Sequence, residues 1–226
     1  IATLALFRSL RLVAAAAVVL GRTRDARTWT ERAERLRRDF HRAYADEGGR
    51  LHSDAPAVYA LAIVFAMVEG DQAQAAGDRL AHLVRAADHR VIAGFAGAPY
   101  LCDALTMTGH VDDAHALLMN RSTPGWLAPV LLGATTVWER WDSLLPDGTV
   151  NPGEMTSFNH YALGAVADWI HRVVGGLTSL APGWRRVRID PRPPAGMSWA
   201  RTSIDTAAGT IRVAWQREPA SDEVHV

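Results

Sequence analysis

The residues best suited to chemistry gather at positions 133–142, which read Gly-Ala-Thr-Thr-Val-Trp-Glu-Arg-Trp-Asp. Within this segment Glu139 stands between Trp138 and Trp141. Sites that process sugars combine these residue types, because an indole ring stacks on the apolar face of a pyranose while a carboxylate handles a proton. Glu139 is therefore a candidate catalytic residue. In the alternative interpretation, both tryptophans belong to the core and Glu139 forms a surface ion pair with Arg140.

A second polar motif follows at residues 157–166, which read Ser-Phe-Asn-His-Tyr-Ala-Leu-Gly-Ala-Val. Ser157 is a suitable N-cap, so the pattern predicts a helix that begins there and ends at the glycine pair 175–176. Asn159 and His160 would then lie in the first turn of this helix, where they are expected to bind hydroxyl groups. In the alternative, His160 is a structural residue with its own hydrogen-bond partners.

Other kinds of reactive site find no support in the sequence. The eight other histidines show no spacing with carboxylates that resembles a metal site. No glycine-rich turn of a nucleotide site and no Gly-x-Ser-x-Gly motif of an acyl hydrolase is present. Cys102 is the single cysteine, so neither a disulfide nor a thiolate zinc site is available within the chain. We therefore predict no metal and no cofactor.

The charge balance argues against two classes of partner. The 226 residues hold 24 basic side chains, all arginine, and 24 acidic ones, so no net field attracts nucleic acid or an anionic membrane surface. Residues 1–20 are apolar enough to suggest a membrane span, but Arg8 and Arg11 would each cost about 2.5–3.5 kcal/mol within one. We predict instead a buried helix of a soluble protein.

The elements that must position these residues are helices in pairs. Apolar residues recur at helical spacing in six successive segments, which are divided within each pair at Gly21, Gly70 or Gly109. In the first two pairs the leading segment is the more apolar, as in a toroid with inner and outer helices. Periodicity alone also fits an α-solenoid or a bundle. The predicted pairs are 1–20 with 25–44, 57–68 with 72–87, and 99–108 with 111–119.

Beyond residue 120 the pattern changes twice. Residues 120–157 form a long loop rich in Gly, Pro, Trp, Thr and Asp, and Trp126 in this loop joins the two other tryptophans as a candidate sugar-stacking ring. After Pro182, alternation of apolar and polar residues indicates a small antiparallel β unit. The predicted strands are 184–189, 198–204 and 210–215.

The two polar motifs together resemble the bacterial α-L-rhamnosidases of glycoside hydrolase family seventy-eight. The resemblance covers nearly the whole chain and implies a partial (α/α)₆ toroid of the six-hairpin type at residues 1–180, followed at residues 181–226 by the start of a C-terminal β-sandwich. It is carried by residues 133–142, Met155 and residues 157–166, with support from Gly94, Phe95, Gly97, Pro99 and residues 124–127.

This resemblance implies an inverting glycosidase that removes terminal α-L-rhamnose from glycosides or from rhamnose-containing polysaccharides. Glu139 maps onto the general base of such an enzyme, which deprotonates a water on one face of the sugar. His160 maps onto a histidine that contacts the rhamnose. We expect Asn159 and the three indoles, Trp126, Trp138 and Trp141, to line the same substrate site. A second carboxylic acid, about 6.5–9.5 Å from the base, would protonate the leaving oxygen.

The chain departs from the family pattern in ways that bear on activity. The general acid of the family lies upstream of anything in these residues, so we expect a fragment that lacks this acid and the N-terminal half of the barrel. Locally, Ala93 and Ala98 replace threonines, and Pro56 replaces a glutamine. We expect the isolated chain to be inactive and prone to self-association through helix faces that lack partners.

Two other interpretations stay open on the sequence alone. The chain could be a non-catalytic carbohydrate-binding remnant that keeps its indoles without the acid, or another glycosidase on the same helical scaffold. The sequence leaves the oligomeric state open. It also leaves the compartment open, because any secretion signal would precede Ile1.

Overall fold

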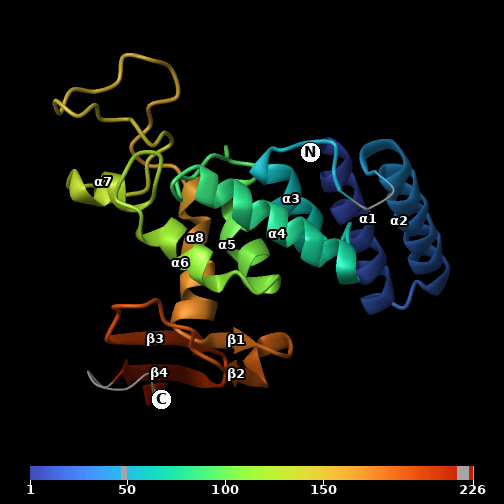
Figure 1. Cartoon of the computed structure of the whole chain (residues 1–226). Helices are drawn as coiled ribbons and strands as arrows, with labels where there is room; N and C mark the ends of the chain where they lie inside the picture. The colour runs from blue at the N-terminus through green and yellow to red at the C-terminus, as the bar shows by residue number, and fades with distance from the viewer. Residues whose placement is uncertain (47–49, 218–223, 226) are drawn as a thin grey trace. The chain divides into compact units, whose positions relative to one another are not determined.

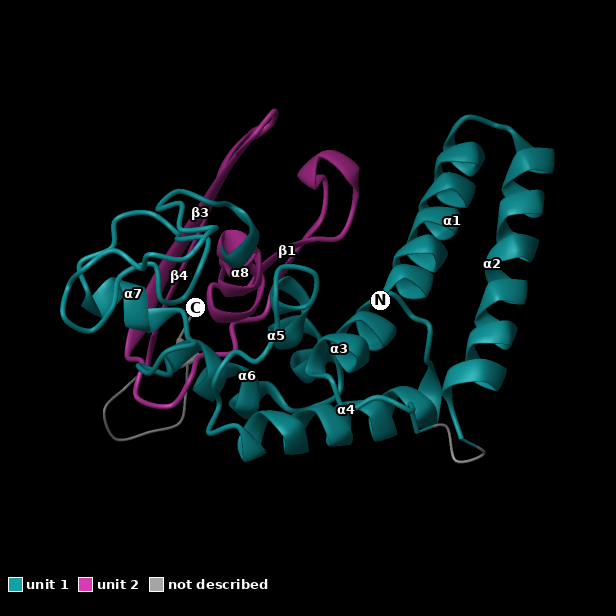
Figure 2. Ribbon diagram, turned by 90° about the horizontal axis from the view of Figure 1, so that it is seen from above, with its two compact units in different colours: residues 1–163 teal, residues 164–226 magenta. Residues whose placement is uncertain are grey.

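The structure, a computed structural model, describes residues 1–46, 50–217 and 224–225 (Figure 1). The chain is mainly helical, with a small antiparallel β part, as the sequence predicts. It divides into two compact units, residues 1–163 and residues 164–226 (Figure 2). The first unit contains the paired helices and the long loop, and the second contains the strands β1 to β5.

The first hairpin pairs α1 (Ala2–Val19) with α2 (Thr23–Tyr44), and Figure 2 shows the two helices side by side. The chain reverses at Gly21, whose φ of +68° suits a glycine at a helix end. The prediction of a buried first helix is wrong for this chain, because only 22% of α1 is buried. One stripe, with Leu4 and Phe7, is buried, while the opposite apolar face is open to solvent.

Among the described residues, α1 is the one helix that is long and apolar enough to cross a membrane, judged by length and composition. Its two arginines lie against aromatic rings. The Arg8 guanidinium is 5.6 Å from the ring centre of Phe65, and the Arg11 guanidinium is 5.8 Å from that of Phe7. Such cation–π contacts contribute about 0.5–1 kcal/mol at exposed sites, and the first of them fastens α1 to the helices that follow.

Two further hairpins form the core of the first unit, and they confirm the predicted helix pairs. α3 packs against both α4 and α5, so it is covered on two sides and six of its nine residues are buried. It ends earlier than predicted because Ala66 adopts a φ of +57°, which a continuing helix does not allow. The helices are α3 (Pro56–Val64), α4 (Gly70–Ala86), α5 (Ala98–Met107) and α6 (Val111–Met119).

The long loop predicted after residue 120 is present, but one short helix within it, α7 (Leu127–Leu131), was not predicted. Five residues are too few for a periodic pattern to show. The predicted helix from Ser157 is also wrong at its start. Residues 157–161 are not helical, and the helix begins as the 3₁₀ turn η1 (Ala162–Ala165), which leads into α8 (Val166–Trp169) and a π-helical turn, η2 (Ile170–Val174).

The second unit carries two small antiparallel sheets, in which β1 pairs with β2 and the other strands follow the order β3-β4-β5. The side chains of Val213 and Trp215 are buried, and the Trp215 indole donates a 2.7 Å hydrogen bond to the carbonyl of Val174, so the sheet is fixed to η2. The strands are β1 (Leu177–Ser179), β2 (Val187–Ile189), β3 (Trp199–Thr206), β4 (Gly209–Arg217) and β5 (Val224–His225).

The strand predictions are confirmed for β3 and β4 and are partly wrong for the two strands that precede them, β1 and β2. β1 was not predicted, because three residues give no alternation to read. The predicted strand 184–189 contracts to β2, since Trp184 has a φ of +58° and closes the 3₁₀ turn η3 (Pro182–Trp184). The β3–β4 hairpin turns where Thr206 faces Gly209, as the glycine predicted.

Candidate active site

Glu139 lines an open cleft of 470 Å³ in the first unit. One wall of the cleft is the segment that precedes α5, residues 91–95, and another wall is residues 139–142. Both walls come from loops, which is where binding residues are most often found. The lining residues are Val91, Ile92, Ala93, Gly94, Phe95, Glu139, Arg140, Trp141, Asp142 and Leu163.

The two motifs singled out in the sequence lie against each other in an extended pairing. The Glu139 amide donates to the carbonyl of Ser157 at 2.9 Å, and the His160 amide donates to the carbonyl of Val137 at 2.8 Å. The Thr136 hydroxyl also donates to the carbonyl of Phe158. Because these backbone groups are engaged with the other segment, they cannot form a helical turn. The prediction that Asn159 and His160 occupy the first turn of a helix is therefore wrong.

The Glu139 carboxylate is held on one side only. Its Oε2 accepts a 3.2 Å hydrogen bond from the Ser157 amide. Among the described residues Glu139 makes no ion pair, so the alternative of a pair with Arg140 does not hold. The half-buried carboxylate thus keeps acceptor capacity toward the cleft.

The Arg140 guanidinium forms its ion pair with Asp142 instead. Its Nε and Nη2 donate to the two carboxylate oxygens of Asp142 at 3.0 and 3.1 Å, and its Nη1 donates to the carbonyl of Glu154 at 3.1 Å. The Asn151 amide adds a 3.0 Å hydrogen bond to Oδ2 of Asp142. The two parallel bonds from Arg140 to Asp142 form a fork. Together with the bond from Arg140 to Glu154, this fork joins the two ends of the loop 142–154. Sequence reasoning missed it, although an Arg and an Asp two residues apart were visible.

The three indoles predicted to face the substrate have different surroundings. Trp141 is half-buried and lines the cleft. Trp126 is 9% exposed, donates from its indole to the carbonyl of Leu163 at 2.8 Å and meets Trp141 edge to face at 5.7 Å. Trp138 is 4% exposed and packs edge to face on Phe158. Of the three indoles, Trp141 lines the cleft, while Trp126 packs on Trp141 from the core and Trp138 is buried against Phe158.

His160 is fixed in orientation by its neighbours. Its Nδ1 accepts a 3.3 Å hydrogen bond from the Ala162 amide, which places the ring proton on Nε2. The imidazole stacks on Phe95, with ring centres 4.8 Å apart, and on Tyr161 at 5.3 Å. Asn159 is exposed. Neither Asn159 nor His160 lines the cleft itself, but Phe95 does, so the stack links His160 to the cleft wall.

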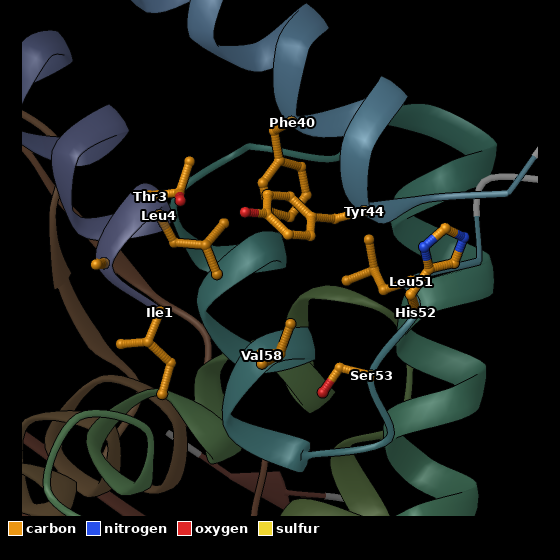
Figure 3. A pocket seen from close by; sticks show the side chains of 10 residues that line it. Ile1, Thr3, Leu4, Phe40, Tyr44, Leu51, His52, Ser53 and Val58 are labelled. Atoms are coloured by element: carbon orange, nitrogen blue, oxygen red, sulfur yellow. The ribbon is translucent and has the colours of Figure 1, made fainter.

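A second cavity, of 380 Å³, lies among the start of α1, the end of α2 and the start of α3 (Figure 3). It contains no carboxylate and therefore cannot perform the acid and base steps of glycoside cleavage. Among the described residues, no group of three or more His, Cys, Asp and Glu side chains is arranged to hold a metal ion. The lining residues are Ile1, Ala2, Thr3, Leu4, Phe40, Tyr44, Leu51, His52, Ser53 and Val58.

A carboxylate with free acceptor capacity, set beside an indole in an open cleft on helical hairpins, is typical of glycoside hydrolases. Comparisons with known proteins give the family. Residues 1–174 match the bacterial alpha-L-rhamnosidase six-hairpin glycosidase domain, and residues 176–226 match the bacterial alpha-L-rhamnosidase C-terminal domain. The chain therefore belongs to the bacterial α-L-rhamnosidase family, and its helical hairpins are part of the six-hairpin toroid that the sequence predicts.

Curated relatives and solved structures agree with this assignment. The alpha-L-rhamnosidase of Streptomyces avermitilis is 39% identical over 217 residues, which are 96% of this chain and 21% of the relative. The crystal structure of that enzyme with L-rhamnose superposes with a TM-score of 0.91 at 38% identity, covering 97% of this chain and 21% of that one. The Aspergillus terreus enzyme gives a TM-score of 0.89 at 36% identity, with 93% and 24% covered. The chain thus spans about a fifth of the length of the curated relatives it matches.

Proposed function

We propose that the chain carries the general base and part of the sugar-binding surface of an inverting α-L-rhamnosidase, which releases terminal α-L-rhamnose from glycosides or polysaccharides. The observation that carries this proposal is the state of Glu139. Its carboxylate lines the cleft, accepts one bond from the Ser157 amide and makes no ion pair among the described residues. A general base needs such a free, oriented oxygen.

In the proposed reaction, a water oxygen attacks the anomeric carbon of rhamnose while the bond to the leaving oxygen breaks. Glu139 takes the proton of this water through the oxygen that Ser157 does not hold. Attack from the face opposite the leaving group inverts the configuration at the anomeric carbon. The Ser157 amide keeps the carboxylate in one orientation, so little reorganisation is needed when the water reacts.

The leaving oxygen needs a proton from a second carboxylic acid, about 6.5–9.5 Å from the base. Asp142 is the other carboxylate of the cleft, but Arg140 and Asn151 occupy its oxygens. We infer that the acid is supplied by a segment of the protein outside these residues. The isolated chain is then unable to complete the reaction.

Recognition of the sugar falls to three groups in this proposal. Trp141 offers its ring to the apolar face of the pyranose. His160 donates from Nε2 to a sugar hydroxyl, because its Nδ1 is already engaged by Ala162. Asn159, which is exposed, has both a donor and an acceptor for a further hydroxyl. Trp126 supports Trp141 through their edge-to-face contact, and Trp138 packs on Phe158, the chain neighbour of Asn159.

The test uses the intact protein that contains these residues, with p-nitrophenyl α-L-rhamnoside as substrate. We expect Glu139→Gln to lower kcat by about 10²- to 10⁴-fold, the usual contribution of a general base. Glu154→Gln is the matched control, because Glu154 lies in the same loop and only its carbonyl is used. Proton NMR should show the β-anomer of rhamnose first. Full activity of Glu139→Gln would refute the assigned base, and initial release of the α-anomer would refute inversion.

A separate measurement tests the missing acid. The purified 226-residue chain should release no rhamnose under conditions in which the intact protein is active. Release that disappears in Glu139→Gln would show that this chain holds both catalytic groups, and the inference about the acid would then be wrong.

A further inference from the structure

The outer face of the β3–β4 hairpin displays a row of exposed side chains whose positions follow from the strand register. Thr202, Val213 and Trp215 are buried on the inner face, so the residues between them point outward. Each outward residue of β3 faces an outward residue of β4, and all of them are exposed. The facing pairs are Trp199 with Gln216, Arg201 with Ala214, Ser203 with Arg212, and Asp205 with Thr210.

Trp199 is unusual on this face. It is 61% exposed, and it is the only one of the eight tryptophans, all of which lie in described residues, that the structure leaves exposed. An indole is among the largest apolar surfaces in a protein, and leaving it in water forgoes the stabilisation that its burial would give. An exposed indole on a rigid strand is therefore available to a ligand at little cost in side-chain ordering.

Two cations accompany the indole. The Arg201 guanidinium lies 5.7 Å from the ring centre of Trp199, which holds it beside the ring. Arg212 stands one strand away, opposite Ser203. Within the described part of the chain, neither arginine has an ion-pair partner. Among the described residues of this face the one carboxylate is Asp205, which stands at the far end and accepts a 2.7 Å hydrogen bond from Thr210.

The small side chains of this face lie between the larger ones. Arg201 and Arg212 stand at diagonal positions of the register, and the residues directly opposite them, Ala214 and Ser203, have small side chains. From Trp199 to the register position of Arg212 is about 13 Å along the strands, at ~3.3 Å a residue. That length accommodates more than one pyranose ring. Gln216, opposite Trp199, adds an amide that can donate and accept beside the indole.

We propose that this face, made by Trp199, Arg201, Arg212 and Gln216, is a secondary binding site for an acidic oligosaccharide that contains uronic acid residues. One pyranose ring stacks on Trp199, and sugar carboxylates pair with the two guanidinium groups. Arginine suits this role, because its planar fork matches a carboxylate with two parallel hydrogen bonds. The site shares no residue with the Glu139 cleft, so the proposal does not depend on hydrolysis.

The test is calorimetric titration of the intact protein that contains these residues with a galacturonate oligosaccharide, and with a neutral galactose oligosaccharide of the same length. We expect the acidic ligand to bind more tightly than the neutral one. Trp199→Ala and the double variant Arg201→Gln/Arg212→Gln should each weaken binding of the acidic ligand at least tenfold. Because all three positions are exposed, thermal unfolding of both variants should match that of the unaltered chain.

Two control variants distinguish binding at this specific site from nonspecific binding to exposed indoles or arginines. Trp29→Ala removes an indole that also carries an arginine, Arg32, at 4.8 Å, but on α2. Arg188→Gln removes an exposed arginine of β2. Neither should change the affinity. Absence of binding, or equal loss in a control, would overturn the proposal. Equal affinity for the neutral ligand, or for single-stranded DNA, would overturn the assignment to acidic sugars.

Discussion

The ring of Phe95 stacks on the imidazole of His160, with centres 4.8 Å apart and planes inclined by 16°. Phe95 lines the same cleft as Glu139, whereas His160 is paired through its backbone with Val137. The stack therefore joins two segments that are far apart in the sequence. It also covers one side of the imidazole that the proposed function assigns to a sugar hydroxyl.

Loss of this stack should weaken substrate binding. In the intact protein, we expect Phe95→Leu to lower kcat/KM for an α-L-rhamnoside up to about tenfold, mainly through KM. Such aromatic pairs contribute about 0.5–1.5 kcal/mol, and about 1.4 kcal/mol corresponds to tenfold. Phe65→Leu is the control, since Phe65 packs on Tyr100 in the helical core. Phe65→Leu should lower the free energy of unfolding and leave KM unchanged. If KM of Phe95→Leu equalled that of the unaltered protein, the role of the stack would be refuted.

The Arg140–Asp142 fork should matter for catalysis more than for stability. Asp142→Asn breaks the ion pair that closes the loop behind Glu139, so we expect kcat of the intact protein to fall about tenfold as the base loses its fixed position. The free energy of unfolding should change by less than about 1 kcal/mol, because the pair is partly exposed. Arg27→Gln breaks an exposed pair with Glu31 and should change neither quantity. A large loss of stability without a loss of kcat would contradict the prediction.

Asp113 should stabilise the fold in a pH-dependent way. Its side chain is 9% exposed and accepts bonds from Arg85 at 2.8 and 2.6 Å and from His89 at 3.0 Å. Burial by itself would raise the pKa of Asp113, but the hydrogen bonds from Arg85 and His89 outweigh it and the pKa is lowered. A lowered folded pKa means that the stabilisation is fully present above the unfolded value, about 3.9, and is lost as the pH falls below it.

Urea unfolding of the chain at several pH values checks this. At pH 7 we expect Asp113→Asn to lower the free energy of unfolding by about 2 kcal/mol, the range for a buried charge-assisted bond. The difference should shrink progressively below about pH 4. Asp147→Asn is the comparison, since the pKa of Asp147 is also lowered by hydrogen bonds from Thr149 but its loop is exposed. A loss for Asp113→Asn that is independent of pH would show that packing, not charge, is responsible.

Two glycines of the segment before α5 should respond differently to substitution by alanine. A Cβ on Gly97 would stand 2.8 Å from Cα of Ala57 on α3, which is too close. We expect Gly97→Ala to lower the free energy of unfolding by about 1–3 kcal/mol, the cost of overpacking. A Cβ on Gly94 would meet nothing within 4 Å, so Gly94→Ala should be neutral or slightly stabilising. If Gly97→Ala and Gly94→Ala changed the melting temperature equally, the close approach of α3 and α5 would be contradicted.

Periodicity predicted the helix pairs because each helix must bury one stripe of apolar side chains. In the sequence these apolar residues recur every three or four positions. Gly21 and Gly109 mark the breaks correctly, since both adopt a left-handed φ that other residues avoid. The alternation of β3 and β4 was visible for the same reason, with Val213 and Trp215 turned inward. Residue type also singled out Glu139, because a carboxylate between indoles has a recognisable chemistry.

Tertiary structure alone decided the details that depend on partners distant in the sequence. The segment of Asn159 and His160 is extended because residues 137–139 take its backbone bonds, and no local signal distinguishes this from a helix start. Arg140 pairs with Asp142 and not with Glu139, so the candidate base has no ion pair among the described residues. Of three similar indoles, packing buried Trp126 and Trp138 and left Trp141 in the cleft. Local sequence fixes which elements form, because their hydrogen bonds and side-chain periods are local, whereas long-range packing determines which side chains they present.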